Sequence, residues 1–294
     1  MMASTFSGLI AAGVFAGLDG ARGLSGWRWL FLIQGVVTVG VAAASYFLLP
    51  DTPLQTRWLT EEERQLAHDR IARDTTNKRV ASSTWVGLWD AAKDYRTWVF
   101  ALMVNLHLSA NNFKNYLPTA VKSLGFSTTV TLVLTCPPYL VSSFVSIFVS
   151  WSSGRFNERT WHITISKAFA VFGFVLATAT YNIGARYFAM VVFVGATYGV
   201  NNITLAWTAA TVGQTDEKKA AAIAIVNSLG NLSFVYTPYL WNDDTAPLFR
   251  PAMLGSVGFS AAVVLTAWVM RWILVRANRK IRAADNEAIN FYAY

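Results

Sequence analysis

The sequence predicts an all-α integral membrane protein with about eight transmembrane helices. Of its 294 residues, 54% are hydrophobic and only 14% are charged, whereas soluble domains carry about 25% charged residues. Apolar runs of about 20 residues recur, and at about 1.5 Å per helical residue each run crosses a hydrocarbon core of about 30 Å. The longest polar segment, residues 51–96, separates two such runs from six later ones.

Eight apolar runs are the candidate spans: residues 4–18, 29–49, 97–118, 128–150, 161–181, 185–212, 220–241 and 252–275. The first is short and starts almost at Met1, without the basic segment that begins a signal peptide. We therefore expect residues 1–50 to be the two-span remnant of an N-terminal helical half. Residues 97–276 are expected to form a C-terminal six-helix half, and residues 277–294 a cytosolic tail.

The polar segment 51–96 reads as a cytosolic linker that contains an amphipathic helix. Thr60 and Glu63 have the spacing of a capping box, which predicts a helix that begins there. Farther along, Trp85, Leu88 and Trp89 share one helical face, as expected for a helix at the membrane interface.

Lys and Arg are distributed unevenly between the two sides of the predicted membrane. Sixteen lie in segments 51–96, 155–159, 218–219 and 276–282, and five on the other side, at Arg22, Arg28, Lys122, Arg186 and Arg250. The positive-inside rule places both termini in the cytosol. This asymmetry explains the net charge of +8 without nucleic acid as a partner, and it favours contact with anionic lipid.

The stretch "NLHLSANNFKNYLP" places polar side chains inside an apolar run. His107, Asn111, Lys114 and Asn115 are spaced for one helical stripe, together with Pro118. Ionisable side chains inside a span usually face the bundle interior or an aqueous cavity. We interpret the stripe as the wall of a substrate cavity, with Lys114 as the counter-charge of an anion. Alternatively, Lys114 extends to the interface and the asparagines bond between helices.

Two other runs contain asparagine pairs that are candidate substrate ligands. They are Asn201 and Asn202 in "YGVNNITLAW", and Asn227 and Asn231 in "IVNSLGNLSF". Hydrogen bonding between helices explains each residue, taken singly, better than direct substrate contact does. Three polar stripes on different spans nevertheless favour a common cavity.

Several spaced motifs resemble one transporter family. "GWRWLFLIQGVVTVGVAAASYFLLPDTPLQTRWLTEEER", "NYLPTAVKSLGFS", "TCPPYLVS", "GQTDEKKAAAIAIVNSLGN", "YTPYLW" and "DNEAINFYAY" are similar to the fungal allantoate permease-like, anion:cation symporter branch of the major facilitator superfamily. The resemblance implies a twelve-helix fold of which this chain has spans five to twelve. It also implies a secondary transporter for a small organic anion, a carboxylate or ureide, in the plasma membrane.

The resemblance also extends to a loop signature in "WSSGRFNERTWH". Arg155 and Arg159 match its basic positions, whereas Gly154 stands where an Asp is expected. No Asp or Glu lies clearly inside a predicted span. Proton coupling would therefore depend on His107 or on spans outside this chain.

Two other classes of function, an enzyme and a transport-incompetent membrane protein, are the alternatives to transport. An enzyme needs clustered catalytic or metal-binding groups, but His68, His107, His162 and Cys136 are scattered, so we expect neither an enzyme nor a cofactor. The second is a transport-incompetent truncated membrane protein that binds a partner. Because transporter sites lie between two halves, we expect the chain to need a missing N-terminal half or a second copy of itself.

Overall fold

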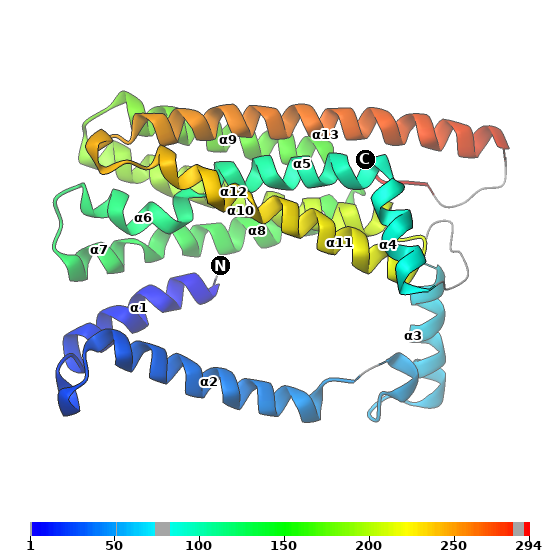
Figure 1. Cartoon of the computed structure of the whole chain (residues 1–294), viewed down its shortest axis with the longest axis horizontal. Helices are drawn as coiled ribbons and strands as arrows, with labels where there is room; N and C mark the ends of the chain where they lie inside the picture. Colours follow the sequence, from blue (N-terminus) through cyan, green and yellow to red (C-terminus); the bar gives the residue numbers. More distant parts are fainter. Residues whose placement is uncertain (1, 51, 74–82, 285–290) are drawn as a thin grey trace. The chain divides into compact units, whose positions relative to one another are not determined.

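The computed structural model describes residues 2–50, 52–73, 83–284 and 291–294, and every regular element in these ranges is helical (Figure 1). Parts of the predicted linker (51 and 74–82) and of the predicted tail (285–290) lie outside the described residues. The chain divides into two compact units, one of residues 6–75 and one of residues 1–5 and 76–294.

The unit of residues 6–75 contains α1 (Met2–Gly17, from residue 6), α2 (Gly26–Leu48) and α3 (Glu61–Arg73), with short 3-10 turns η1 (Ala21–Gly23) and η2 (Pro53–Gln55). The predicted capping box is present at the start of α3. The backbone N of Thr60 donates to Glu63 Oε2 at 2.9 Å, and the backbone N of Glu63 donates to Thr60 Oγ1 at 3.4 Å. The bond from the Thr60 backbone lowers the pKa of Glu63.

The second unit contains α4 (Thr84–Lys93), α5 (Tyr95–Ala110), α6 (Phe113–Lys122), α7 (Thr128–Leu134), α8 (Cys136–Arg155), α9 (Thr160–Ala179), α10 (Ile183–Thr211), α11 (Asp216–Asn231), α12 (Ser233–Tyr236), η3 (Thr237–Leu240), η4 (Asp243–Thr245) and α13 (Arg250–Ala284). The principal packing pairs are α9 with α10, α8 with α10, α9 with α13, and α5 with α11 and α13.

Six helical segments among the described residues are long and apolar enough to cross a membrane: Gly26–Leu48, Val130–Arg155, Thr160–Ala179, Ile183–Thr211, Asp216–Leu240 and Arg250–Ala284. They match six of the predicted runs. The first run contains a shorter apolar helix, Phe6–Gly17.

The run 97–118 is the exception, because it is not one continuous helix. α5 ends at Ala110 and α6 begins at Phe113, with Asn111 and Asn112 between them. Asparagine side chains compete with the helical ladder by bonding to nearby groups, and Asn115 Nδ2 donates to Asn112 Oδ1 at 3.0 Å. Pro118, inside α6, lacks the N–H that would continue the helical ladder.

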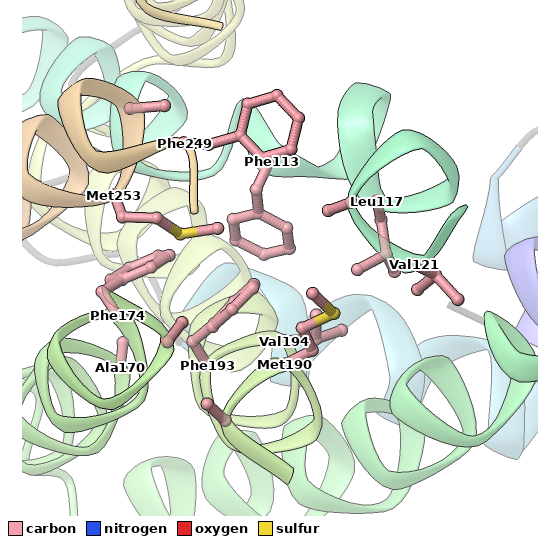
Figure 2. Close-up of a cluster of buried hydrophobic side chains, with 14 of the residues drawn as sticks. Phe113, Leu117, Val121, Ala170, Phe174, Met190, Phe193, Val194, Phe249 and Met253 are labelled. Atoms are coloured by element: carbon pink, nitrogen blue, oxygen red, sulfur yellow. The ribbon is translucent and has the colours of Figure 1, made fainter. Parts of the chain in front are cut away.

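The larger of two main buried clusters joins α6, α9, α10 and α13 (Figure 2). The Phe113 ring lies 4.7 Å from that of Phe193, which stacks on Phe174 at 4.6 Å. Gly173 allows this close approach of α9 to α10, since a Cβ there would lie 2.9 Å from the Phe193 backbone nitrogen. The break before Phe113 therefore starts α6 inside the aromatic core.

Candidate functional site

The break between α5 and α6 divides the predicted polar stripe. His107, Asn111 and Asn112 are buried, whereas Lys114 is half-buried and Asn115 is exposed, as is Pro118. The run is therefore not one unbroken helix, and the polar residues assigned to one stripe differ in burial. The stripe assumed an unbroken helical period, and the turn at residues 111–112 interrupts it.

Lys114 extends across α6 toward α12. Its Nζ lies 4.6 Å from the centroid of the Phe234 ring, a cation–π contact. Its backbone carbonyl accepts a hydrogen bond from the Tyr139 hydroxyl at 3.3 Å. No carboxylate within salt-bridge distance of Lys114 occurs among the described residues, so its charge remains available to an anion.

A polar network that the sequence analysis missed joins α5 to α11 and α12. The Tyr236 hydroxyl donates to Asn105 Oδ1 at 2.6 Å and lies 2.7 Å from Ser109 Oγ. Asn105 Nδ2 also donates to the Leu229 carbonyl at 2.9 Å. Tyr236 is 42% exposed, so its ring forms part of an open surface. Asn105, two residues before His107, was the signal available in the sequence.

The four predicted asparagines on α10 and α11 have different surroundings. Asn227 and Asn231 are exposed on one face of α11, and Asn231 Nδ2 donates to the Asn227 carbonyl at 2.8 Å. On α10, Asn201 is half-buried and Asn202 exposed. The α11 pair lies on the helix whose continuation carries Phe234 and Tyr236.

Lys167 is a buried cation that the sequence analysis overlooked. It lies on α9 and is fully buried, and its Nζ has no hydrogen-bond partner among the described residues. Both ring nitrogens of the fully buried His107 are likewise unpartnered there. Lys167 and Lys114 are both near enough to act electrostatically on His107. A single lysine within the apolar run 161–181 was the signal for it.

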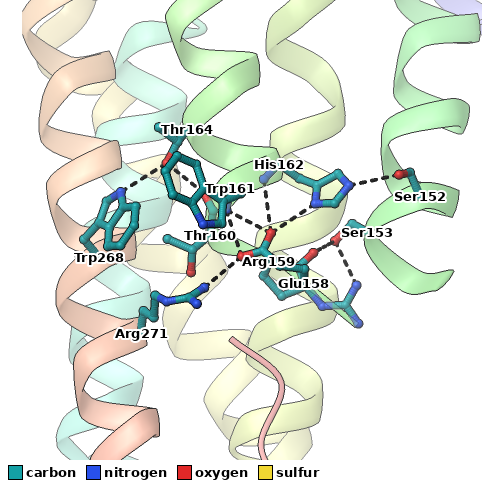
Figure 3. A network of polar contacts seen from close by, with 10 residues as sticks. All are labelled: Ser152, Ser153, Glu158, Arg159, Thr160, Trp161, His162, Thr164, Trp268 and Arg271. Atoms are coloured by element: carbon teal, nitrogen blue, oxygen red, sulfur yellow. Dashed lines mark hydrogen bonds and ion pairs between the residues drawn. The ribbon is translucent and has the colours of Figure 1, made fainter. Parts of the chain in front are cut away.

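The loop signature is organised around Glu158 rather than position 154 (Figure 3). Glu158 accepts from Arg271 Nη1 of α13 at 2.9 Å, and its Oε2 lies 3.1 Å from His162 Nδ1. Arg159 Nη1 donates to Ser153 Oγ at 2.9 Å. Arg155 and Gly154 are exposed, and a Cβ on Gly154 would meet nothing within 4 Å. An acid is thus present, four residues after the expected position.

At the N-terminal end of α5, Asp94 forms a compact charge cluster. Its carboxylate accepts from Arg96 Nη2 and from Lys218 Nζ, both at 2.7 Å, which joins α5 to α11. Burial alone would raise the pKa of Asp94, but the hydrogen bonds and charges of Arg96 and Lys218 outweigh it and lower the pKa to about 2. The carboxylate is therefore ionised at neutral pH. Among the described residues, no group of three or more His, Cys, Asp or Glu side chains is arranged to hold a metal ion.

Comparison with known proteins decides the family. Residues 1–238 match the model of the Major Facilitator Superfamily. The chain belongs to this superfamily. It is 29% identical over 289 residues to the Major facilitator-type transporter hxnP of Emericella nidulans, covering 95% of this chain and 57% of that protein. It is 30% identical over 298 residues to the MFS-type transporter cnsO of Penicillium expansum, covering 95% and 56%.

A bacterial protein is similar as well. The "Putative tartrate transporter" of Agrobacterium vitis is 28% identical over 283 residues, covering 94% of this chain and 60% of that protein. The chain thus spans somewhat more than half the length of these relatives, which are named as transporters and not as enzymes. It is a multi-pass integral membrane protein of a transporter family.

Proposed function

We propose that the chain forms part of a secondary transporter for a small organic anion, of the carboxylate or ureide type, within the allantoate permease-like branch. The observation that carries this proposal is the positive charge buried in the unit of residues 1–5 and 76–294. Lys114 and Lys167 both act electrostatically on His107, and the carboxylates of the described spans, Asp216 and Glu217, lie in the first turn of α11. A cationic interior without a resident counter-charge favours an anionic substrate.

The open face of α5, α6, α11 and α12 supports the same proposal. Lys114 supplies the charge, and Tyr236, Asn115, Asn227 and Asn231 are exposed hydrogen-bonding groups on these helices. A carboxylate or ureide needs both a cation and several donors. Tartrate, in the name of the Agrobacterium vitis relative, is a dicarboxylate of this kind.

Orientation, membrane and coupling belong to the proposal too. The distribution of Lys and Arg supports cytosolic termini, and we place the protein in the plasma membrane. For proton coupling, His107 is the candidate carrier within this unit, because both nitrogens of its buried imidazole are without a hydrogen-bond partner among the described residues. A partner that supplies the opposing wall, another copy or an N-terminal half, completes the proposed cavity.

The test is binding of radiolabelled tartrate and allantoate to the purified chain in detergent. We expect saturable binding of one of them, a loss of at least about tenfold in affinity for Lys114→Ala, and partial retention for Lys114→Arg, because an ion pair with the substrate requires the charge. Lys122→Ala, an exposed lysine at the end of the same helix, is the matched control.

Unchanged affinity in Lys114→Ala would show that Lys114 only extends to the interface. Absence of saturable binding for every carboxylate and ureide tried would instead favour the rival function, a transport-incompetent membrane protein that binds a partner.

A further inference from the structure

α13 is longer than a helix needs to be to cross the hydrocarbon core of a membrane. Its 35 residues measure about 52 Å, against a hydrocarbon core of about 30 Å. Residues 251–270 contain no charged side chain, and Arg271 is the first of several basic residues in the rest of the helix. Trp268 and Trp272, 37% and 54% exposed, mark the interface at which tryptophan concentrates. The segment after Arg271 therefore projects beyond the lipid tails.

This projecting segment lines a cavity of about 560 Å³. Arg271, Asn278, Arg279 and Arg282 come from α13, Glu158 comes from the turn between α8 and α9, and residues 291–294 complete the lining. These parts belong to one compact unit. Figure 3 shows Arg271 reaching from α13 to Glu158 at this end of the bundle.

Residues 291–294 are held in place by several hydrogen bonds that fix the shape of the cavity. Tyr292 and Asn278 bond reciprocally, from Tyr292 N to Asn278 Oδ1 at 2.9 Å and from Asn278 Nδ2 to the Tyr292 carbonyl at 2.8 Å. Trp207 Nε1 donates to the Ala293 carbonyl at 2.9 Å. The Arg159 backbone N donates to the backbone oxygen of Tyr294 at 3.3 Å. The cavity is therefore formed before any ligand arrives.

Among the described residues, the lining carries more basic than acidic side chains. Glu158 is its single acidic side chain among the described residues, and it is already paired with Arg271 at 2.9 Å. Arg279 and Arg282 have no carboxylate partner in the described ranges, although the Arg282 guanidinium lies 5.1 Å from the centre of the Phe291 ring. Two guanidinium groups with free donors match phosphate oxygens in geometry and charge.

We propose that this cavity binds the phosphorylated headgroup of an anionic lipid, an inositol phospholipid, of the cytosolic leaflet. Arg279 and Arg282 lie 8 and 11 residues beyond Arg271, about 12 to 17 Å farther along the helix axis. The headgroup region extends only about 5 to 8 Å beyond the hydrocarbon core. The phosphodiester of a simple phospholipid therefore lies closer to the membrane centre than these side chains do. An inositol ring that carries phosphomonoesters brings its charge out to them. The proposal does not depend on the transported substrate.

The experiment measures binding of the purified chain to lipid in phosphatidylcholine nanodiscs. One preparation contains phosphatidylinositol 4,5-bisphosphate and another contains phosphatidylserine at matched total charge. We expect tighter binding to the inositol lipid. The double variant Arg279→Gln/Arg282→Gln should lose about thirtyfold in affinity, because two basic side chains near an anionic surface contribute that much to binding. Arg250→Gln, an exposed arginine at the opposite end of the same helix, should bind like the parent chain.

Three outcomes would overturn the proposal. Equal affinity of the parent and the double variant would remove the two arginines from the site. Equal binding of phosphatidylserine at matched charge would reduce the effect to a general attraction to anionic membranes. Soluble inositol trisphosphate that binds as tightly as the lipid would identify a free phosphate ester, and not a membrane lipid, as the ligand. A melting temperature of the double variant equal to that of the parent verifies that it is folded.

Discussion

At the scale of single residues, the charged groups in the unit of residues 1–5 and 76–294 follow two different physical rules. Outside the spans, Asp94 and Glu158 each pair with one cation from a distant part of the fold, Lys218 and Arg271. Each also has a second partner nearby in the sequence, Arg96 for Asp94 and His162 for Glu158. Inside the spans, Lys167 has no hydrogen-bond partner among the described residues. A buried unpaired cation is costly in a low-dielectric interior. Such a cost is typical of positions kept for function, whereas the paired acids are explained by stability.

Asp94 gives a prediction about stability and pH. Asp94→Asn leaves Lys218 and Arg96 without their shared anion, and we expect it to destabilise the fold by about 2 kcal/mol. Because the native pKa of about 2 lies below the ordinary value of 3.8, the carboxylate stabilises the fold above about pH 4, and this stabilisation is lost as the pH falls through about 2.

The measurement is the melting temperature of the purified chain in nanodiscs from pH 7 to pH 2. Asp94→Asn should lower it at pH 7 and flatten its fall in acid. Asp90→Asn, on α4 four residues before Asp94 and outside any ion pair of the described residues, is the control. A profile for Asp94→Asn that matches the control would mean that the cluster does not join α5 to α11 in solution.

At the scale of elements, two local features determine how the helices of the unit of residues 1–5 and 76–294 pack. The break at Asn111 and Asn112 turns α6 so that Phe113 enters the aromatic cluster. Glycines allow helix backbones to approach where larger residues would hold them apart. At Gly173 the near neighbours are backbone and Cβ atoms of α10, which cannot move aside as a flexible side chain can.

Gly173 therefore predicts a sharp difference between two alanine substitutions. Gly173→Ala should destabilise the unit by about 1 to 3 kcal/mol, because its methyl group overpacks the contact of α9 with α10. Gly154→Ala, at the end of α8 with nothing within 4 Å of the added Cβ, should be neutral or slightly stabilising. Melting temperatures in nanodiscs compare the two, and equal values would show that α9 and α10 adjust freely.

At the scale of the whole molecule, the relevant fact is that the chain spans 57% and 56% of two curated relatives. Transporter sites lie where two helical repeats meet, and transport proceeds by motion of one repeat against the other. In this chain the exposed polar groups of α11, Asn227 and Asn231, lie on the unit of residues 1–5 and 76–294. We therefore expect substrate binding and transport to be separable.

The prediction concerns uptake by the 294-residue chain alone. Reconstituted in liposomes with a pH gradient, it should show no saturable uptake of radiolabelled carboxylates or ureides. Transport needs two helical halves that move against each other, and the chain spans somewhat more than half the length of its relatives. Protein-free liposomes provide the baseline. Saturable uptake that Lys114→Ala abolishes would contradict this expectation and indicate that an assembly of identical chains supplies the opposing wall.

The sequence by itself determined the membrane class, the helical composition, the approximate spans, the capping box of α3 and the superfamily. These follow from local properties: apolar runs must satisfy their backbone groups within helices, and Thr60 and Glu63 are three residues apart. Tertiary structure decided the rest. Only the packing of α5 against α11 and α12 placed Asn105 beside Tyr236 and Asp94 against Lys218. These contacts join residues 131 and 124 positions apart, and no helical period encodes which face of one helix meets which face of another.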